Sequence, residues 1–184
     1  MTLLRELAEE LGTNERTLRR GLAEGLVRGR RPTPRRVELA AGEIRYLRAN
    51  WHLLAAIREV LRTERVVRLA VLIGSAARGE LRERSDVDLL VGLGDSDWRR
   101  RDRLSERLSR TVGRPVDLVS LEAVKADPLL LDTALREGRV VVDRDNAWPS
   151  LLADAPRIAR LARRAEGRLR DQLHELVSQL SDDR

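Results

Sequence analysis

The sequence predicts an α/β fold in which a small mixed β-sheet core is flanked by helices, with an all-helical module before it and one helix after it. Two observations predict this class. Short apolar runs typical of strands alternate with segments of helical periodicity in the middle of the chain, and charged segments with apolar residues every three or four positions lie on both sides of it. We therefore expect a helix-turn-helix module over residues 1–36, a connecting helix over 37–65, the α/β core over 66–145 and a C-terminal amphipathic helix over 146–184.

The N-terminal module is predicted to consist of two short helices joined by a tight turn. The helices are expected over residues 3–11 and 14–23, each preceded by a threonine that can act as N-cap, with Gly12 in the turn. Leucines at helical spacing face inward, and the unit resembles small bacterial DNA-binding domains. Gly21 argues against this interpretation, because a glycine inside the second helix lowers its stability.

The N-terminal module also carries the excess positive charge. Residues 16–36 hold eight arginines and one glutamate, whereas the whole chain has a formal net charge of only +6. This asymmetry indicates an anionic partner near the N-terminus. If the partner is DNA, the second helix is the recognition helix, and the contacting residues are expected to be Asn14, Arg16, Thr17, Arg19, Arg20, Arg30 and Arg31. The alternative is a helical hairpin whose arginine face lies in solvent.

Hydrophobic periodicity predicts the remaining elements. A long helix is expected over Ala41–Thr63, in which Tyr46, Trp51 and His52 are packing or surface residues rather than ligands. Strands are expected over Val66–Ile73, Val87–Val91, Val116–Ser120 and Arg139–Val142, and further helices over Asp97–Val112, over Leu121–Gly138 with an interruption near Pro128, and in the tail from about Pro156.

Composition restricts the chemistry. The chain has no cysteine, which excludes disulfides and thiolate metal sites. With three tryptophans, one tyrosine and no phenylalanine, its core must be built from Leu, Val, Ile and Ala. No apolar run approaches a membrane span, and the first residues lack the apolar core of a signal peptide, so we expect a cytoplasmic protein with no membrane partner.

A candidate site begins where the first apolar strand ends. Gly74 and Ser75 provide backbone N–H groups and a hydroxyl at the start of a short helix, a position that favours anions. Asp86 and Asp88 stand at alternate positions of the next strand, so their side chains point the same way. Adjacent carboxylates repel each other unless a cation lies between them, and Mg²⁺ prefers oxygen ligands and accompanies phosphates. The pattern therefore indicates phosphoryl or nucleotidyl transfer.

The motif of Gly74-Ser75, a spacer of ten residues and Asp86-Val87-Asp88 resembles the signature of the nucleotidyltransferase superfamily of DNA polymerase β, and most closely its small bacterial minimal nucleotidyltransferase branch. Ala77-Arg78-Gly79 and Ser85 also match that signature, and the resemblance spans roughly residues 66–142. It implies a nucleotidyltransferase core in which Gly74, Ser75, Arg78 and Ser85 contact the nucleotide.

A two-metal mechanism needs a third carboxylate beside Asp86 and Asp88. Asp117 is the best candidate because it is the lone acid of an apolar strand, and the family carries a catalytic acid on such a strand. Its role would be to bind the activating metal and to accept the acceptor's proton. Asp143 and Asp145 are the competitors, but they flank an arginine at a strand end and are typical of turn residues. The expected cofactor is a pair of Mg²⁺ ions, with Mn²⁺ as a substitute.

The resemblance implies Mg²⁺-dependent transfer of an NMP, and specifically AMP from ATP, to a hydroxyl group of a protein or RNA acceptor. Several members of the minimal branch are antitoxins that adenylylate a HEPN toxin, so a HEPN-type partner is implied by analogy. Two alternatives remain open. One is a DNA-binding transcription regulator whose transferase domain only senses nucleotide. The other is an antibiotic nucleotidyltransferase, which the short segment after the last strand disfavours.

Overall fold

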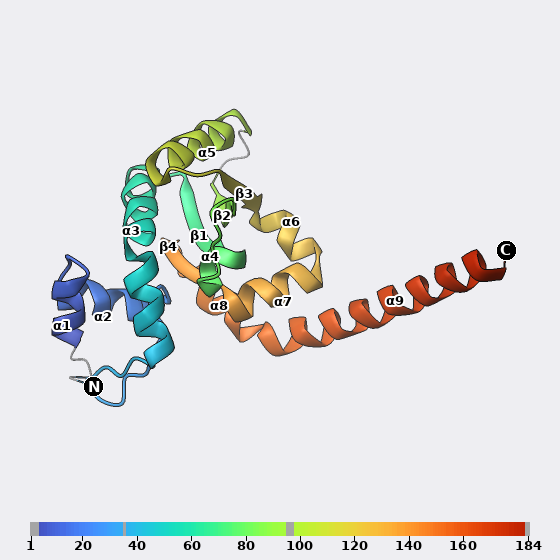
Figure 1. The fold of residues 1–184 in the computed structure, drawn as a ribbon, viewed down its shortest axis with the longest axis horizontal. Helices are drawn as coiled ribbons and strands as arrows, with labels where there is room; N and C mark the ends of the chain where they lie inside the picture. The colour runs from blue at the N-terminus through green and yellow to red at the C-terminus, as the bar shows by residue number, and fades with distance from the viewer. Residues whose placement is uncertain (1–3, 35, 95–97, 183–184) are drawn as a thin grey trace.

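The computed structural model describes residues 4–34, 36–94 and 98–182 of the chain (Figure 1). The helices are α1 (Leu4–Glu10), α2 (Glu15–Glu24), α3 (Ala41–Thr63), α4 (Gly74–Arg78), α5 (Trp98–Val112), α6 (Leu121–Ala126), α7 (Pro128–Glu137), α8 (Ala147–Ala153) and α9 (Ala155–Asp182). The strands are β1 (Val67–Ile73), β2 (Val87–Leu93), β3 (Val116–Ser120) and β4 (Arg139–Asp143).

The strands form one sheet in the order β3-β2-β1-β4. β1 pairs antiparallel with β2 and β4, whereas β2 and β3 run parallel. Parallel neighbours need a crossover connection, and α5 lies in the crossover between β2 and β3. The predicted mixed α/β fold is therefore confirmed.

Each face of the sheet is buried under its own set of helices. Side-chain alternation along β1 sends Ala70 and Leu72 into a core shared with α3 and α5, and Leu69 and Val71 into a second core shared with α6, α7 and α8. In Figure 1 the sheet lies between these two groups of helices. Because both faces are covered, the central strands are almost continuously apolar in sequence.

The N-terminal helices extend the first of these cores. Leu7 and Leu26 are buried in the same apolar cluster as Leu54 of α3. The packing also accounts for the glycine that weakens the second helix in isolation. A Cβ on Gly21 would lie 3.0 Å from Val27 Cγ2, so glycine lets the chain fold back against α2 without displacing this side chain.

The connecting helix agrees with its prediction at both ends. α3 begins and ends at the expected residues, Tyr46 and Trp51 are buried in it, and His52 is exposed. The strands also match within one or two residues, with β2 and β4 running on to Leu93 and Asp143. Asp97, the expected first residue of the helix after β2, lies outside the described residues.

The interruption predicted near Pro128 is also present, and its physical cause is a helix cap. Asp127 accepts hydrogen bonds from the N–H groups of Leu129 and Leu130 at 2.9 and 3.3 Å, with the proline at the first turn of α7. Gly138 ends α7 as expected, although its φ of −63° is not left-handed.

The tail consists of two helices where the sequence predicted one. Asp143 caps α8 by accepting hydrogen bonds from Ala147 N and Trp148 N at 2.9 and 3.0 Å. The first turns of α9 then pack on α7 and bury Ile158, and the rest of α9 extends away from the body (Figure 1). Within the described ranges, none of the helices combines the length and apolarity that a membrane crossing requires.

Candidate functional site

The strand register brings two of the three candidate carboxylates together. Asp88 of β2 and Asp117 of β3 are direct partners in the parallel pair, so both side chains leave the same face of the sheet. On the same face, further along these strands, Leu90 and Val119 pack against α6 and α7. Asp86 is exposed and comes one residue before β2, at the same end of the sheet. Asp117 is exposed and Asp88 is half-buried.

Gly74 lies directly against Asp88, the inner member of this carboxylate pair. The last residue of β1, Ile73, is the register partner of Asp88, and α4 begins at the next residue. Gly74 has a φ of +65°, and a Cβ built on it would lie 2.5 Å from Asp88 Oδ2. The position therefore requires glycine for its left-handed backbone and for the close approach of the carboxylate. Ser75 follows in the first turn of α4 and is half-buried.

The crowding of negative charge changes the acidity of the central carboxyl. The pKa of Asp88 is raised above its ordinary value, first by burial and then by the negative charges of Asp117 and Asp86. Ionised Asp88 therefore carries a free-energy cost in the isolated protein. A bound cation at this point would remove part of that cost.

Stability is expected to reflect this cost. Because the folded-state pKa of Asp88 is higher than the unfolded one, the folded state holds the proton more tightly. The contribution of Asp88 to the free energy of unfolding thus falls as the pH rises from the ordinary carboxyl range, and it stays unfavourable at neutral pH. We expect Asp88→Asn to raise the Tm of the ligand-free protein at pH 7, and the difference from wild type to shrink toward pH 4.

Thermal unfolding of both proteins, measured between pH 4 and 8 without divalent ions, tests this expectation. A variant less stable than wild type at pH 7 would show that the carboxylate contributes favourable interactions.

The donor set fits a divalent metal. Within the described part of the chain, no three His, Cys, Asp or Glu side chains are grouped closely enough to hold a metal ion by themselves. Mg²⁺ at nucleotide sites is held by one or two carboxylates, with phosphate oxygens and water filling the remaining positions. Asp88 and its register partner Asp117 offer two such carboxylates, and the charge of Asp86 also acts on Asp88.

Arg78 and Ser85, both assigned to the nucleotide from the sequence, have local partners. The Arg78 guanidinium at the far end of α4 pairs with Glu80 and Glu137 at 2.7 and 2.8 Å. The Ser85 hydroxyl accepts a hydrogen bond from Arg82 N at 2.9 Å and shapes the turn before β2. Their contact with a nucleotide stays a prediction.

The acidic competitors have structural roles. Asp143 caps α8, and Asp145 pairs with Arg68 at the surface. Neither belongs to the group of charges that acts on Asp88.

The residues assigned to nucleic acid comprise two that form the start of α2 and five arginines. Asn14 caps α2 by accepting hydrogen bonds from the N–H and hydroxyl groups of Thr17, so both residues are engaged in the helix start. The arginines have partners as well in three cases: Arg19 pairs with Glu15, Arg20 with Glu24, and Arg31 donates to Pro34 O. The exposed arginines of this set are Arg16, Arg20, Arg30 and Arg31.

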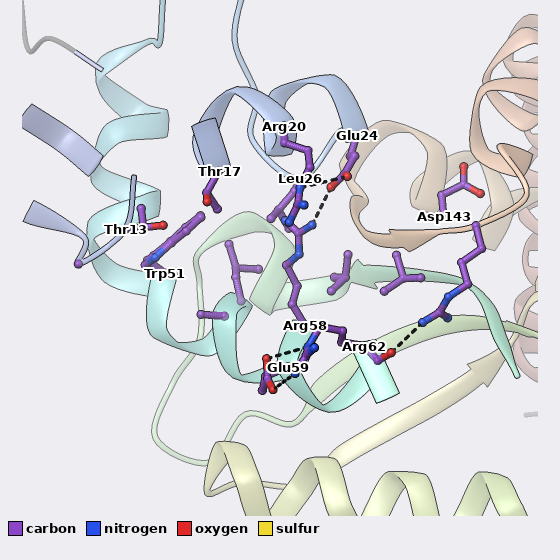
Figure 2. Close-up of a pocket in the computed structure, with 16 residues that line it drawn as sticks. Thr13, Thr17, Arg20, Glu24, Leu26, Trp51, Arg58, Glu59, Arg62 and Asp143 are labelled. Carbon is purple, nitrogen blue, oxygen red and sulfur yellow. Dashed lines mark hydrogen bonds and ion pairs between the residues drawn. The ribbon is translucent and has the colours of Figure 1, made fainter. Parts of the chain in front are cut away.

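A second feature was not anticipated from the sequence. A cavity of about 520 Å³ lies between the turn that follows α1 and the elements α3 and β4, and residues from that turn, α2, α3 and β4 line it (Figure 2). Ion pairs line its wall, with Arg58 joined to Glu24 at 2.7 Å and Arg62 to Glu59 at 2.8 Å. Only the tertiary fold creates this cavity, since its lining is scattered along the chain.

Comparison with solved structures identifies this architecture. A toxin–antitoxin complex with AMP-PNP has a chain that superposes with a TM-score of 0.54 at 21% identity, covering 66% of this chain and 98% of that one. A mutant MntA–HpeT toxin–antitoxin gives 0.55 at 20% identity, covering 66% and 98%. A complex of a tri-AMPylated Shewanella oneidensis HEPN toxin with MNT antitoxin gives 0.51 at 19% identity, covering 66% and 96%. At these identities the likeness shows a shared fold.

The sequence itself provides the family assignment. No curated protein sequence matches the chain. The family model described as polymerase beta, nucleotidyltransferase matches residues 55–147, which is half of the chain. The matched region contains Gly74, Asp86, Asp88 and Asp117, the residues that meet at one end of the sheet. This chain therefore belongs to the polymerase beta family of nucleotidyltransferases and is an enzyme of that class.

Proposed function

We propose that this enzyme transfers AMP from ATP to a hydroxyl group on a protein or RNA acceptor. One observation carries the proposal: Asp88 and Asp117 stand side by side at the end of the sheet, and Asp88 lies against the left-handed Gly74 that opens α4. Carboxylates next to the start of a helix suit the joint binding of a divalent metal and a triphosphate.

Each residue has a role in this proposal. Asp86, Asp88 and Asp117 would hold Mg²⁺, for which Mn²⁺ can substitute, and the bound metal supplies charge neutralisation and activation of the attacking oxygen. The N–H of Ser75 and its hydroxyl would donate to phosphate oxygens. Asp117 would accept the proton of the acceptor hydroxyl as its oxygen bonds to the α-phosphorus and pyrophosphate leaves.

The acceptor we propose is a HEPN-type protein, which would make this chain the antitoxin of a toxin–antitoxin pair. Support comes from the structural neighbours, which are toxin–antitoxin complexes, one with AMP-PNP and one with a tri-AMPylated HEPN toxin. The likeness is one of fold, and the proposal rests on analogy beyond it.

Label transfer tests the activity and identifies the acceptor. The purified enzyme is incubated with Mg²⁺, each α-³²P-labelled NTP and lysate of its own host, beside an Asp86→Ala/Asp88→Ala control. We expect a labelled protein or RNA band with ATP that the control lacks. Absence of label with every NTP, while the protein still binds nucleotide and DNA, would favour a regulator that senses nucleotide. Label on an added aminoglycoside alone would favour antibiotic modification.

We also propose that the N-terminal module binds DNA. The exposed guanidinium groups of Arg16, Arg20, Arg30 and Arg31 within the basic segment of residues 16–36 support this. Asn14 and Thr17 are less suited to reading bases, because each is engaged in the α2 cap.

Salt dependence tests the DNA proposal. If Arg16 and Arg30 each neutralise one phosphate, Arg16→Ala/Arg30→Ala should weaken duplex binding and reduce the slope of log K against log salt by about 2. Fluorescence anisotropy over a NaCl series measures the slope. The matched control is Arg160→Ala/Arg163→Ala, which removes two exposed arginines from α9. Equal losses of DNA affinity in both variants would show that only the net charge of the protein matters, which would contradict binding through the N-terminal module.

A further inference from the structure

The most deeply buried ion pair of the described residues joins helix α3 to strand β4 of the sheet. Arg139, the first residue of β4, and Glu43 of α3 have side chains only 3% and 6% exposed. The pairing is bidentate, with Arg139 Nη1 and Nη2 donating to the two Glu43 carboxylate oxygens at 2.7 and 2.8 Å. Buried pairs of this kind add little net stability over apolar residues, so stability alone does not account for this pair.

The remaining contacts of this guanidinium reach α4. Arg139 Nε donates to Ala77 O at 2.9 Å, and the guanidinium stacks 3.4 Å from the centre of the Tyr46 ring. The Tyr46 hydroxyl in turn donates to Ala76 O at 3.1 Å. Arg139 and Tyr46 thus hold two consecutive carbonyls in the last turn of α4.

α4 depends on such external support. The helix has five residues, and a helix this short is not stable by itself. Its first residue is Gly74, whose backbone is packed against Asp88. A movement of α4 therefore changes the distance between the Gly74–Ser75 loop and the carboxylates.

The same cluster includes the segment after α2. Leu26 O accepts a hydrogen bond from Arg139 Nη1 at 3.2 Å, and Arg28 N donates to Glu43 Oε1 at 2.9 Å. One buried network therefore links the N-terminal module, α3 and α4. Most of its members lie outside the segment that the family model matches.

We propose that Arg139, Glu43 and Tyr46 are positioning residues that fix the Gly74–Ser75 loop against Asp88, so that the N-terminal module is a working part of the transfer site. The inference deepens the proposed function and rests on it for the identity of the ligand. It assigns the network no contact with the nucleotide and only indirect action through α4.

Tyr46→Phe is the first test, because it removes one hydroxyl and keeps the ring beneath Arg139. We expect Mg·ATP binding, measured by calorimetry on the full chain, to weaken about tenfold, the effect of one well-placed hydrogen bond. We also expect faster hydrogen exchange at the amides of Gly79 and Glu80, which bond to carbonyls of α4. Arg139→Lys keeps the charge but loses the bidentate fork, and it should weaken Mg·ATP binding as well.

The matched control is Glu24→Gln. The Glu24–Arg58 pair ties α2 to α3 as the network does, but it faces the cavity of Figure 2 and does not touch α4. We expect it to leave ATP affinity and α4 exchange unchanged. Equal effects of Glu24→Gln and Tyr46→Phe would overturn the proposal, as would wild-type α4 exchange in Tyr46→Phe. A wild-type protein that binds no ATP, with the exchange contrast intact, would count against the proposed function and leave the positioning role standing.

Discussion

Replacing Asp88 by asparagine is expected to abolish nucleotidyl transfer, with a loss on the order of 10³-fold or more. Asp88 is the carboxylate whose acidity responds to both of the others, and it lies against the loop that opens α4. An amide of the same shape keeps the packing and removes the charge that a divalent metal requires. Because the same substitution is expected to stabilise the ligand-free protein at neutral pH, the loss of activity will not be explained by unfolding.

Two further variants locate the third acid. Asp117→Asn should cause a loss similar to that of Asp88→Asn, since the two carboxylates are register partners on neighbouring strands. Asp145→Asn is the control, because this carboxylate pairs with Arg68 and takes no part in the electrostatics of Asp88. The measurement is initial rate of label transfer under saturating ATP and Mg²⁺. Full activity in Asp117→Asn would show that the enzyme works with two carboxylates.

The fold was largely predictable because its strands are buried on both faces and its helices are strongly periodic. Both patterns are local, and they placed α3, β1 and β3 to within a residue. The division of the tail into α8 and α9 was missed, because the cap of α8 is a carboxylate at the end of β4 that the sequence shows only as a turn residue.

The candidate site likewise has features that the sequence indicates and features that only the tertiary structure shows. Asp117 was proposed because it is the lone acid of its strand and because of the family resemblance, whereas its register with Asp88 comes from the pairing of β2 with β3 and is visible only in the structure. The ion pairs that engage Arg78 come from α7 and from the loop after α4, and they depend on tertiary structure. Glu43 had a usable signal, because it lies on the same stripe of α3 as Leu47 and Leu54 and is therefore expected to be buried. A buried carboxylate implies a buried cation, but nothing local identifies it as Arg139.

Gly74→Ala is expected to lower transfer by on the order of 10²-fold or more, since displacement of reacting groups by about 1 Å has that effect. The added methyl would have to lie 2.5 Å from Asp88 Oδ2, so either the carboxylate or α4 must move. A second penalty comes from the backbone, because φ at this residue is +65°.

Gly113→Ala separates the two penalties. Gly113 also has a left-handed backbone, with a φ of +72°, but a Cβ there meets nothing within 4 Å. Both alanine variants should lose about 1 kcal/mol of stability from backbone strain, while only Gly74→Ala should lose activity and Mg²⁺-dependent stabilisation by ATP. Thermal shift with and without Mg·ATP, combined with label transfer, measures both effects. Equal activity in the two variants would mean that the close contact between Gly74 and Asp88 is not needed for transfer.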